Sequence, residues 1–375
     1  CKYYPDNMIV VRQDSPLVIG RGLDENYISS DIPAILSFTK DFYFLNDREF
    51  AVLARDNIDF YDNDLNKIDK VVKSIEWNTA SAEKDGYDDF MLKEIYEQPS
   101  VIKDTYRGRL LANKGIIQMA GVEDNLEKFL NAKRILIVAC GTSWHAGLVA
   151  EYIIEEFSRI PVEVEYASEF RYRNPIINKD DVVIAISQSG ETADTLAAIK
   201  LAKENGAFVF GVCNVVGSSI SRETHAGAYT HAGPEIGVAS TKAFTTQITI
   251  LTLLALRLAK AKGTMNNSDY QRYLLELELM PEKVQEALLT NDVAKQIAEI
   301  YKDATNCLYL GRGYNFPVAL EGSLKLKEIS YIHAEGYPAA EMKHGPIALI
   351  DEHMPVIVIA PNKGHYDKVV SNIQE

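Results

Sequence analysis

The sequence predicts an α/β fold in which two related parallel-sheet units follow a β-rich N-terminal segment. Over residues 1–75, short apolar runs alternate with turns, which is typical of strands joined by tight connections. From about Arg134 onward, apolar runs alternate with helical stretches, the pattern of a parallel sheet covered on both faces. This second pattern recurs with similar order and spacing over residues 307–361, which indicates an internal duplication.

The N-terminal segment is expected over residues 1–78, followed by a linker with helices over 79–125. A charged stretch leads into Phe90–Pro99, where we expect a short helix that ends at Pro99 because proline disfavours a helical conformation in the residue before it. The apolar runs of the segment are Met8–Val11, Pro16–Gly20, Phe42–Leu45 and Phe50–Leu53.

The first parallel-sheet unit is predicted over residues 126–268. Its expected strands are Ile135–Ala139, Val182–Ile186 and Phe208–Cys213, and its expected helices cover about Ser143–Phe157, Thr192–Asn205 and Ser240–Lys260.

The second unit is predicted over residues 296–375 and is incomplete at its C-terminal side. Cys307–Gly313 precedes a helix that runs through Lys325, and Met354–Pro361 takes the part of the strand before Ser187. Two unrelated α/β units in series are the alternative, but both the order and the spacing recur, which favours duplication.

Composition restricts the class of partner. The chain has 375 residues, a formal net charge of −14 and a sequence pI of about 5.1, which argues against nucleic acid or an anionic membrane. Its four cysteines form no CxxC motif and no cluster with histidine, so we expect reduced thiols in a cytoplasmic protein without a metal site. The most apolar stretch, Phe244–Ala259, contains Gln247 and Arg257, which favours a buried helix over a membrane span.

The strongest functional signal is the loop Ser187–Thr192, which lies between a buried strand and a helix. Three hydroxyls and one amide can join the unpaired backbone N–H groups of the helix N-terminus, and Gly190 permits close approach of a ligand. A simple helix cap needs only one such side chain. The loop therefore predicts a phosphate site built without cations, with donors from Ser187, Gln188, Ser189 and Thr192.

Two further loops combine glycine and hydroxyl residues before a helix. Cys140-Gly141-Thr142-Ser143 ends a neighbouring strand, so its donors can converge with the first loop at the edge of the sheet where ligands bind in open α/β folds. Gly237–Phe244 precedes a long helix. There, capping by Ser240 or Thr241 and contact with a substrate hydroxyl both remain open.

Two segments near the C-terminus could supply acid–base chemistry. Glu321, Lys325 and Glu328 are spaced to share one helix face, either as a solvated ion-pair stripe or as a catalytic carboxylate with a lysine beside it. His344 lies in a turn before Gly345 and Pro346, either as an ordinary loop residue or as a proton carrier near neutral pH.

Taken together, these segments resemble the glutamine–fructose-6-phosphate aminotransferase (glucosamine-6-phosphate synthase) family, in which a glutaminase domain of the N-terminal-nucleophile type precedes two sugar isomerase (SIS) domains. The resemblance runs nearly end to end. It is carried by Ser15–Gly20, Lys93–Pro99, Ala139–Ser143, Ala167–Arg173, Ser187–Thr195, Glu235–Thr246, Glu321–Glu335 and Lys343–Pro346.

The resemblance implies roles for individual residues. Glu328 would move a proton between C1 and C2 of the sugar, Lys325 would lie beside it, and His344 of a neighbouring subunit in a homodimer would assist ring opening. The sugar is fructose 6-phosphate and the nitrogen donor is glutamine; no metal or redox cofactor is expected. The substrate-binding residues would be Cys140, Gly141, Thr142, Ser143, Ser187, Gln188, Ser189, Thr192, Val238 and Ser240.

The chain also departs from the family pattern. The family's nucleophile is an N-terminal Cys-Gly-Ile, whereas Cys1 is followed by Lys2-Tyr3-Tyr4 and aligns inside the domain, so we assign it no catalytic role. We expect a fragment without the nucleophile and without the C-terminal Schiff-base lysine, which binds the sugar phosphate but does not aminate it. A phosphosugar isomerase and a non-enzymatic sugar-phosphate sensor are the alternative functions.

Overall fold

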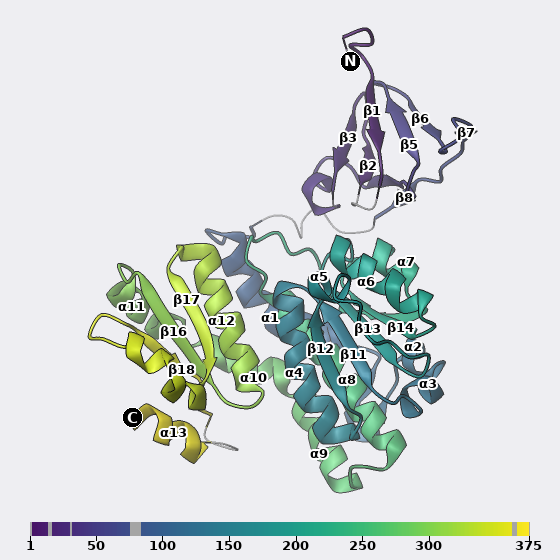
Figure 1. The fold of residues 1–375 in the computed structure, drawn as a ribbon. Helices are drawn as coiled ribbons and strands as arrows, with labels where there is room; N and C mark the ends of the chain where they lie inside the picture. The colour runs from purple at the N-terminus through teal and green to yellow at the C-terminus, as the bar shows by residue number, and fades with distance from the viewer. Residues whose placement is uncertain (1, 14–16, 31, 76–83, 362–365, 375) are drawn as a thin grey trace.

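The computed structural model describes residues 2–13, 17–30, 32–75, 84–361 and 366–374, and it confirms the expected α/β class. Figure 1 shows a β-rich N-terminal unit above two units that each contain a sheet and helices. The expected boundary at residues 78–79, together with Cys1, Ser15 and Pro16, lies outside the described residues.

The N-terminal unit consists of two four-stranded antiparallel sheets packed on each other. Val18 and Ile19 are both buried but face opposite sides of their strand, so one contributes to the core between the sheets and the other to a core on the outer side. One sheet has the order β1 (Met8–Val11), β5 (Phe50–Leu53), β6 (Ile58–Tyr61), β7 (Lys67–Ile68). The other has the order β3 (Asn26–Ser29), β2 (Val18–Arg21), β4 (Asp41–Phe44), β8 (Lys73–Ser74), with the short helix η1 (Pro33–Ile35) after β3.

The helix expected to stop at Pro99 continues, so that prediction is wrong. Helix α1 spans Phe90–Tyr106 with Pro99 inside it. Proline cannot donate to the carbonyl of Ile95, but the side-chain amide of Gln98 donates to that oxygen instead, at 3.1 Å. The second half of α1 also buries Ile102 in the core of the first parallel-sheet unit, and this packing favours the continued helix.

The first parallel-sheet unit contains a five-stranded parallel sheet with helices on both faces. Adjacent residues of one strand, such as Ile135 and Leu136, belong to different cores on the two faces. The strand order is β12 (Val162–Tyr166), β11 (Ile135–Ala139), β13 (Val182–Ser187), β14 (Phe208–Cys213), β15 (Ala226–Tyr229). Helices α4 (Gly141–Ser158) and α8 (Lys242–Lys262) cover one face, and α5 (Ala167–Phe170), α6 (Ala193–Glu204) and α7 (Ser219–Glu223) cover the other.

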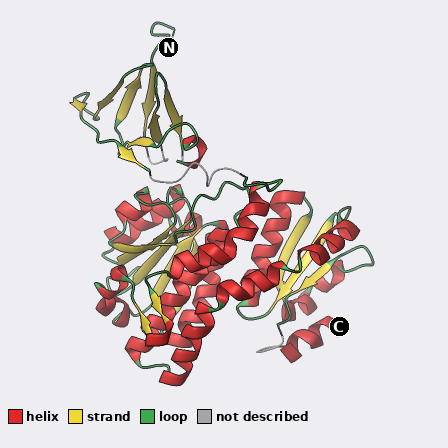
Figure 2. Ribbon diagram, turned by 180° about the vertical axis from the view of Figure 1, so that it is seen from behind, coloured by secondary structure: helices red, strands yellow, loops and turns green. Residues whose placement is uncertain are grey.

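The core of this unit extends beyond residues 126–268. Tyr106, Tyr270 and Leu274 belong to the same buried cluster as the centre of α8. Figure 2, which views the molecule from behind, shows the long helices in front of the first sheet and between the two sheets. The remaining elements around this core are β9 (Leu110–Leu111), η3 (Ala112–Lys114), β10 (Ile116–Ile117), α2 (Ala120–Glu123), α3 (Leu126–Leu130), α9 (Asn267–Glu278), α10 (Met280–Leu288) and α11 (Asn291–Tyr301).

The second unit repeats the topology of the first, as the sequence predicts. Its strands β17 (His333–Pro338) and β18 (Val356–Val358) both pair in parallel with β16 (Asn306–Gly311), in the order β17-β16-β18 that matches β12-β11-β13. Helix α12 (Asn315–Ser330) connects β16 to β17, as α4 connects β11 to β12. The short helices η4 (Ala339–His344) and η5 (Pro346–Leu349) and the helix α13 (Tyr366–Gln374) complete the described part.

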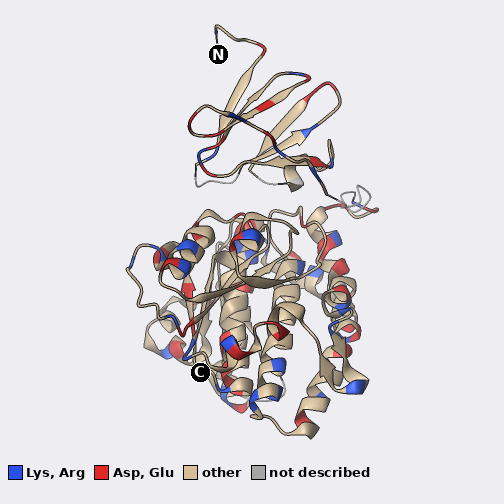
Figure 3. Cartoon of the chain, turned by 90° about the vertical axis from the view of Figure 1, so that its right-hand side faces the viewer, with Lys and Arg blue, Asp and Glu red and all other residues tan. Residues whose placement is uncertain are grey.

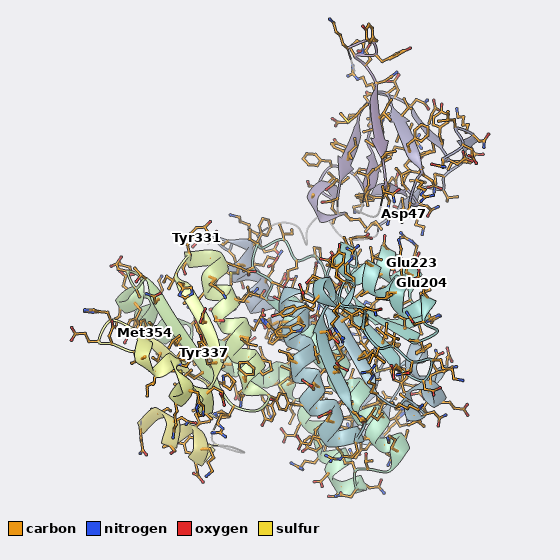
Figure 4. The ribbon with its side chains drawn as sticks, in the orientation of Figure 1. Asp47, Glu204, Glu223, Tyr331, Tyr337 and Met354 are labelled. Atoms are coloured by element: carbon orange, nitrogen blue, oxygen red, sulfur yellow. The ribbon has the colours of Figure 1, made fainter. Side chains whose placement is uncertain are left out.

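Polar and apolar contacts join the N-terminal unit to the first parallel-sheet unit. Arg12 donates to Ser219 Oγ at 3.4 Å, and Asp47 pairs with both Arg12 and Lys200. Val215 belongs to a buried cluster of the N-terminal unit. Figure 4 places Asp47 at the end of that unit that faces Glu223 and Glu204, which are also labelled there.

Charge is distributed without large segregation on the face shown in Figure 3, where acidic and basic residues are interspersed. Among the described residues, none of the helices combines the length and the apolar character needed to cross a membrane.

The centre of α8 supplies a stability prediction. Leu254 is 0% exposed, so Leu254→Ala should lower the free energy of unfolding by about 2–5 kcal/mol through lost burial and the cavity left behind. The matched variant Leu289→Ala, at a site 79% exposed, should change it by less than about 0.5 kcal/mol. Urea unfolding of both variants measures the difference, and equal losses would contradict this assignment of the core.

Candidate functional site

A pocket of about 250 Å³ lies at the carboxyl ends of β11 and β13. The N-termini of α4, α6 and α8 meet at this edge of the sheet, because the segments that precede these three helices all line the pocket. Each helix N-terminus presents unpaired N–H groups and partial positive charge, so the pocket favours an anionic group.

The structure brings nine of the ten predicted substrate-binding residues together in this pocket. Gly141 is the exception: it has a φ of 54° at the start of α4 and lines a neighbouring pocket of about 380 Å³. Ile186 and Glu235, which the sequence reasoning did not single out, also line the site, as does Gly237, which it named only as the start of a loop. The nine residues are Cys140, Thr142, Ser143, Ser187, Gln188, Ser189, Thr192, Val238 and Ser240.

Internal hydrogen bonds shape the loop between β13 and α6. Ser187 Oγ accepts from the Gly190 N–H at 3.0 Å and lies 2.9 Å from Thr192 Oγ1, and Ser189 Oγ accepts from the Glu191 N–H at 3.1 Å. Gly190 has a φ of 68°, and a Cβ there would lie 2.0 Å from the Ser218 hydroxyl oxygen. Only glycine fits this turn, as its conformation and its close approach both require.

Neutral groups provide the donors of the pocket. Among the described residues that line it there is no lysine or arginine. The amide nitrogen of Gln188 is buried and has no hydrogen-bond partner among the described residues, so it can donate to a ligand. Ser143 Oγ accepts from Gln247 at 3.0 Å, which leaves its own hydrogen available for donation. This donor set suits a phosphate group held by local geometry.

The third wall of the pocket is ordered by Glu235. One carboxylate oxygen accepts from the N–H groups of Thr241 and Ala243, at 2.8 and 3.1 Å, and the other accepts from the Ser240 hydroxyl at 2.7 Å. Glu235 therefore accepts hydrogen bonds from backbone N–H groups at the start of α8. Neither Ser240 nor Thr241 caps the helix with its own side chain.

A buried carboxylate joins this pocket to the second unit. Glu321 is 7% exposed; one of its oxygens accepts from Thr142 Oγ1 at 2.9 Å and the other lies 2.6 Å from His145 Nδ1. Lys325 Nζ donates to Thr142 Oγ1 at 3.1 Å and to Glu328 at 2.7 Å. The face of α12 is thus packed against the first unit, which excludes the solvated ion-pair stripe for Glu321 and Lys325.

The sequence reasoning missed His145 as a partner of Glu321. The available signal was its spacing: His145 follows Thr142 by three residues, so both side chains lie on one face of α4. That face is the one that meets α12.

His344 lies apart from the pocket lining. It ends the short helix η4 and is exposed, and a role for it in a neighbouring subunit stays a prediction. Within the described part of the chain, no group of three or more His, Cys, Asp or Glu side chains could hold a metal ion.

The fold and the pocket define the class of protein. Residues 128–257 and 300–375 match the family described as SIS domain, and the chain belongs to that family. The matched segments cover the two parallel-sheet units and include the Ser187–Thr192 loop.

The chain is also similar to several enzymes named glutamine–fructose-6-phosphate aminotransferase [isomerizing]. The enzyme of Chlorobaculum tepidum is 59% identical over 371 residues, and that of Bacteroides thetaiotaomicron is 57% identical over 376 residues. These alignments cover 99% and 100% of the chain but only 60% and 61% of the relatives. The solved C-terminal domain of glucosamine-fructose-6-phosphate aminotransferase from Francisella tularensis is 45% identical with a TM-score of 0.74, over 78% of this chain and 81% of that one.

Glu191 in the phosphate loop gives a pH-dependent prediction. It is 8% exposed, and burial raises its pKa even though a hydrogen bond from Ser219 and the nearby guanidinium groups of Arg222 and Arg12 oppose the rise. Because the pKa of Glu191 is higher in the folded than in the unfolded protein, the protonated side chain stabilises the fold. This contribution is fully present below the pKa of the unfolded state, about 4.3, and is lost as the pH rises through the pKa of the folded state. Glu191→Gln cannot ionise and escapes this loss. The free energy of unfolding of the variant minus that of the parent should therefore increase from acidic to neutral pH. Urea unfolding at several pH values measures this difference. A difference that stays constant or decreases would contradict the burial effect.

Proposed function

We propose that the chain carries the sugar-phosphate part of the reaction in which the amide nitrogen of glutamine is transferred to fructose 6-phosphate, with isomerisation of the product to glucosamine 6-phosphate. One observation carries this proposal: the neutral-donor pocket is linked through Thr142 to the Lys325–Glu328 pair of the second unit. A phosphate site and an acid–base pair thus lie within one hydrogen-bonded network.

In this proposal, the phosphate is held by Ser187, Gln188, Ser189, Thr192 and the N-termini of the surrounding helices. Hydroxyl and amide donors can rotate toward three phosphate oxygens, and the partial charge of the helix ends offsets part of the negative charge. The opposite wall, with Val238 and Ser240, faces the sugar.

Glu328 acts as the base of the isomerisation step. It takes a proton from C1, the C–H electron pair forms a C1–C2 double bond, and the C2=N π pair moves onto the nitrogen, which takes up a proton. The C1 hydroxyl then loses its proton and forms the C1=O bond, and the C1–C2 π pair takes the proton back from the same carboxyl at C2. Lys325, 2.7 Å from Glu328, orients the carboxylate and offsets negative charge that develops on the sugar. Both groups are partly buried, which restricts their motion and strengthens the interaction.

The remaining parts of the proposal concern other surfaces. His344 is exposed, which suits a residue that acts in a neighbouring subunit of a homodimer, where it would assist ring opening. The two antiparallel sheets of the N-terminal unit are assigned to the glutaminase domain, because the relatives that share this segment carry the aminotransferase name.

The two alternative functions are less well supported. A phosphosugar isomerase would have no need for the N-terminal unit, which docks on the first parallel-sheet unit through Arg12 and Asp47. A sugar-phosphate sensor needs only the phosphate loop, so the ordered Glu321–Lys325–Glu328 network would have no purpose in it.

Removing two phosphate donors tests the binding site. Ser189→Ala combined with Thr192→Ala should weaken fructose 6-phosphate binding by roughly 100-fold or more, because each of the two lost hydrogen bonds to a charged group contributes about 1.5–3 kcal/mol. Calorimetry measures the dissociation constant. The control Ser268→Ala with Thr290→Ala removes the same hydroxyls at exposed positions and should bind like the parent. Equal affinity of both double variants would remove the phosphate assignment.

Isotope exchange tests the base. Glu328→Gln keeps the size of the side chain but cannot accept the proton, so hydrogen exchange at C1 and C2 of the sugar should fall by about 100-fold or more, while the sugar phosphate still binds. Nuclear magnetic resonance in deuterated water follows the exchange in the protein that carries this chain. Glu299→Gln, on an exposed part of α11, serves as the matched control. Undiminished exchange in the Glu328 variant would exclude this residue as the base.

A further inference from the structure

Glu94 on α1 is tied to a pocket wall that is distant in sequence. Its side chain is only 2% exposed, and its Oε1 accepts from the N–H groups of Ile236 and Gly237 at 2.6 and 3.0 Å. A carboxylate that is removed from water and accepts two backbone N–H groups fixes the position of those groups strongly. The segment it fixes, residues 235–240, is the wall that carries Val238 and Ser240.

The contact between this wall and α1 is close. A Cβ on Gly237 would lie 2.6 Å from Glu94 Oε2 and 3.3 Å from the Met91 backbone. The absence of a side chain at Gly237 therefore allows the backbone of the wall to lie directly on α1. The same residue lines the pocket on its other side.

Ion pairs attach the end of the wall to the same helix. Lys242, the first residue of α8, pairs with Glu97 at 2.6 Å, and Lys93 pairs with Glu97 at 3.6 Å and with Asp85 at 2.7 Å. Both lysine side chains are buried. Helix α1 thus holds the wall at two points, Glu94 at residues 236–237 and Glu97 at residue 242.

The phosphate loop has different supports. Residues 187–192 are held by their own hydrogen bonds and by Ser219, whose N–H donates to Glu191 at 2.7 Å. None of the hydrogen bonds described for Glu94 reaches this loop. Glu94 therefore contacts only one of the two walls directly. Asn214 lies between them: its N–H donates to the Gln188 carbonyl at 3.2 Å and its side-chain amide donates to the Gly233 carbonyl at 2.6 Å.

We propose that Glu94 is a positioning residue for recognition of the sugar moiety: through Ile236 and Gly237 it sets the wall that contacts the sugar, separately from the loop that holds the phosphate. The inference rests on the proposed function, because it takes a sugar phosphate as the ligand of the pocket. The proposal gives helix α1 a role in ligand binding, although no residue of α1 lines the pocket.

The test compares two ligands by calorimetry. Glu94→Ala should weaken fructose 6-phosphate binding by roughly 10-fold, whereas the affinity for inorganic phosphate should stay within about 2-fold of the parent value. Glu94→Gln keeps an oxygen that accepts from both N–H groups, so it should restore most of the sugar-phosphate affinity. Glu156→Ala, at an exposed position of α4, is the matched control and should resemble the parent for both ligands.

A second variant approaches the contact from the other side. Gly237→Ala introduces a methyl group against Glu94, and it should show the same selective loss of sugar-phosphate affinity as Glu94→Ala. This variant keeps the test decisive if removal of the buried carboxylate prevents folding.

The possible outcomes separate the two proposals. If the parent chain binds neither ligand, the proposed function fails. If the parent binds fructose 6-phosphate but Glu94→Ala and Gly237→Ala bind it equally well, only the positioning role fails. A parallel loss of both ligands, or a Glu94→Gln variant as weak as Glu94→Ala, would also overturn the role, because a merely structural residue would give those results.

Discussion

The carboxylate of Glu321 is the interaction on which the arrangement of the site depends. It is buried between the two parallel-sheet units, where an unpartnered charge would cost several kcal/mol. Its partners are therefore required: Thr142 and His145 from the first unit and Lys325 from its own helix. Since these partners come from both units, a displacement of one unit relative to the other would break hydrogen bonds inside a low-dielectric region. The buried network thus fixes the distance between Thr142 in the pocket lining and Glu328.

The rest of the pocket follows the same principle. Strands β11 and β13 form a rigid apolar base, and the irregular loops at their ends are held by hydrogen bonds within each loop and from outside it. Each wall is anchored by a group outside the pocket or at its rim: Glu321 holds Thr142, Ser219 holds Glu191 of the phosphate loop, and Glu94 holds the wall at Gly237. A ligand therefore meets donors that are already positioned, and less entropy is lost on binding.

The sequence was sufficient to predict strands β11, β13, β14, β16 and β18 and most of the pocket, because those signals are local, but it did not predict the flanking strands β12, β15 and β17. The buried strand β11 and the loop Ser187–Thr192 can be identified from neighbouring residues alone. The errors and omissions involve individual side-chain contacts, some of them between residues far apart in the sequence. The continuation of α1 through Pro99 depends on the amide of Gln98 and on packing against α8. The contacts of Glu94 with Ile236 and of His145 with Glu321 join residues far apart in the sequence, whereas Glu235 meets Thr241, six residues further along the chain.

The duplication explains why the residues proposed for acid–base chemistry and those proposed for phosphate binding lie in different copies. Helices α4 and α12 occupy equivalent places in the two units, and they pack against each other. At such a contact, each copy can supply what the other lacks. The end of β13 carries Ser187 and its neighbours, whereas the corresponding end of β18 continues into Ile359-Ala360-Pro361, which offers no side-chain donor. The second copy instead carries Glu321, Lys325 and Glu328 on α12. Glu321 and Lys325 form hydrogen bonds with Thr142 on the facing side of α4. One site is thus built at the junction of two copies, and neither copy contains it alone.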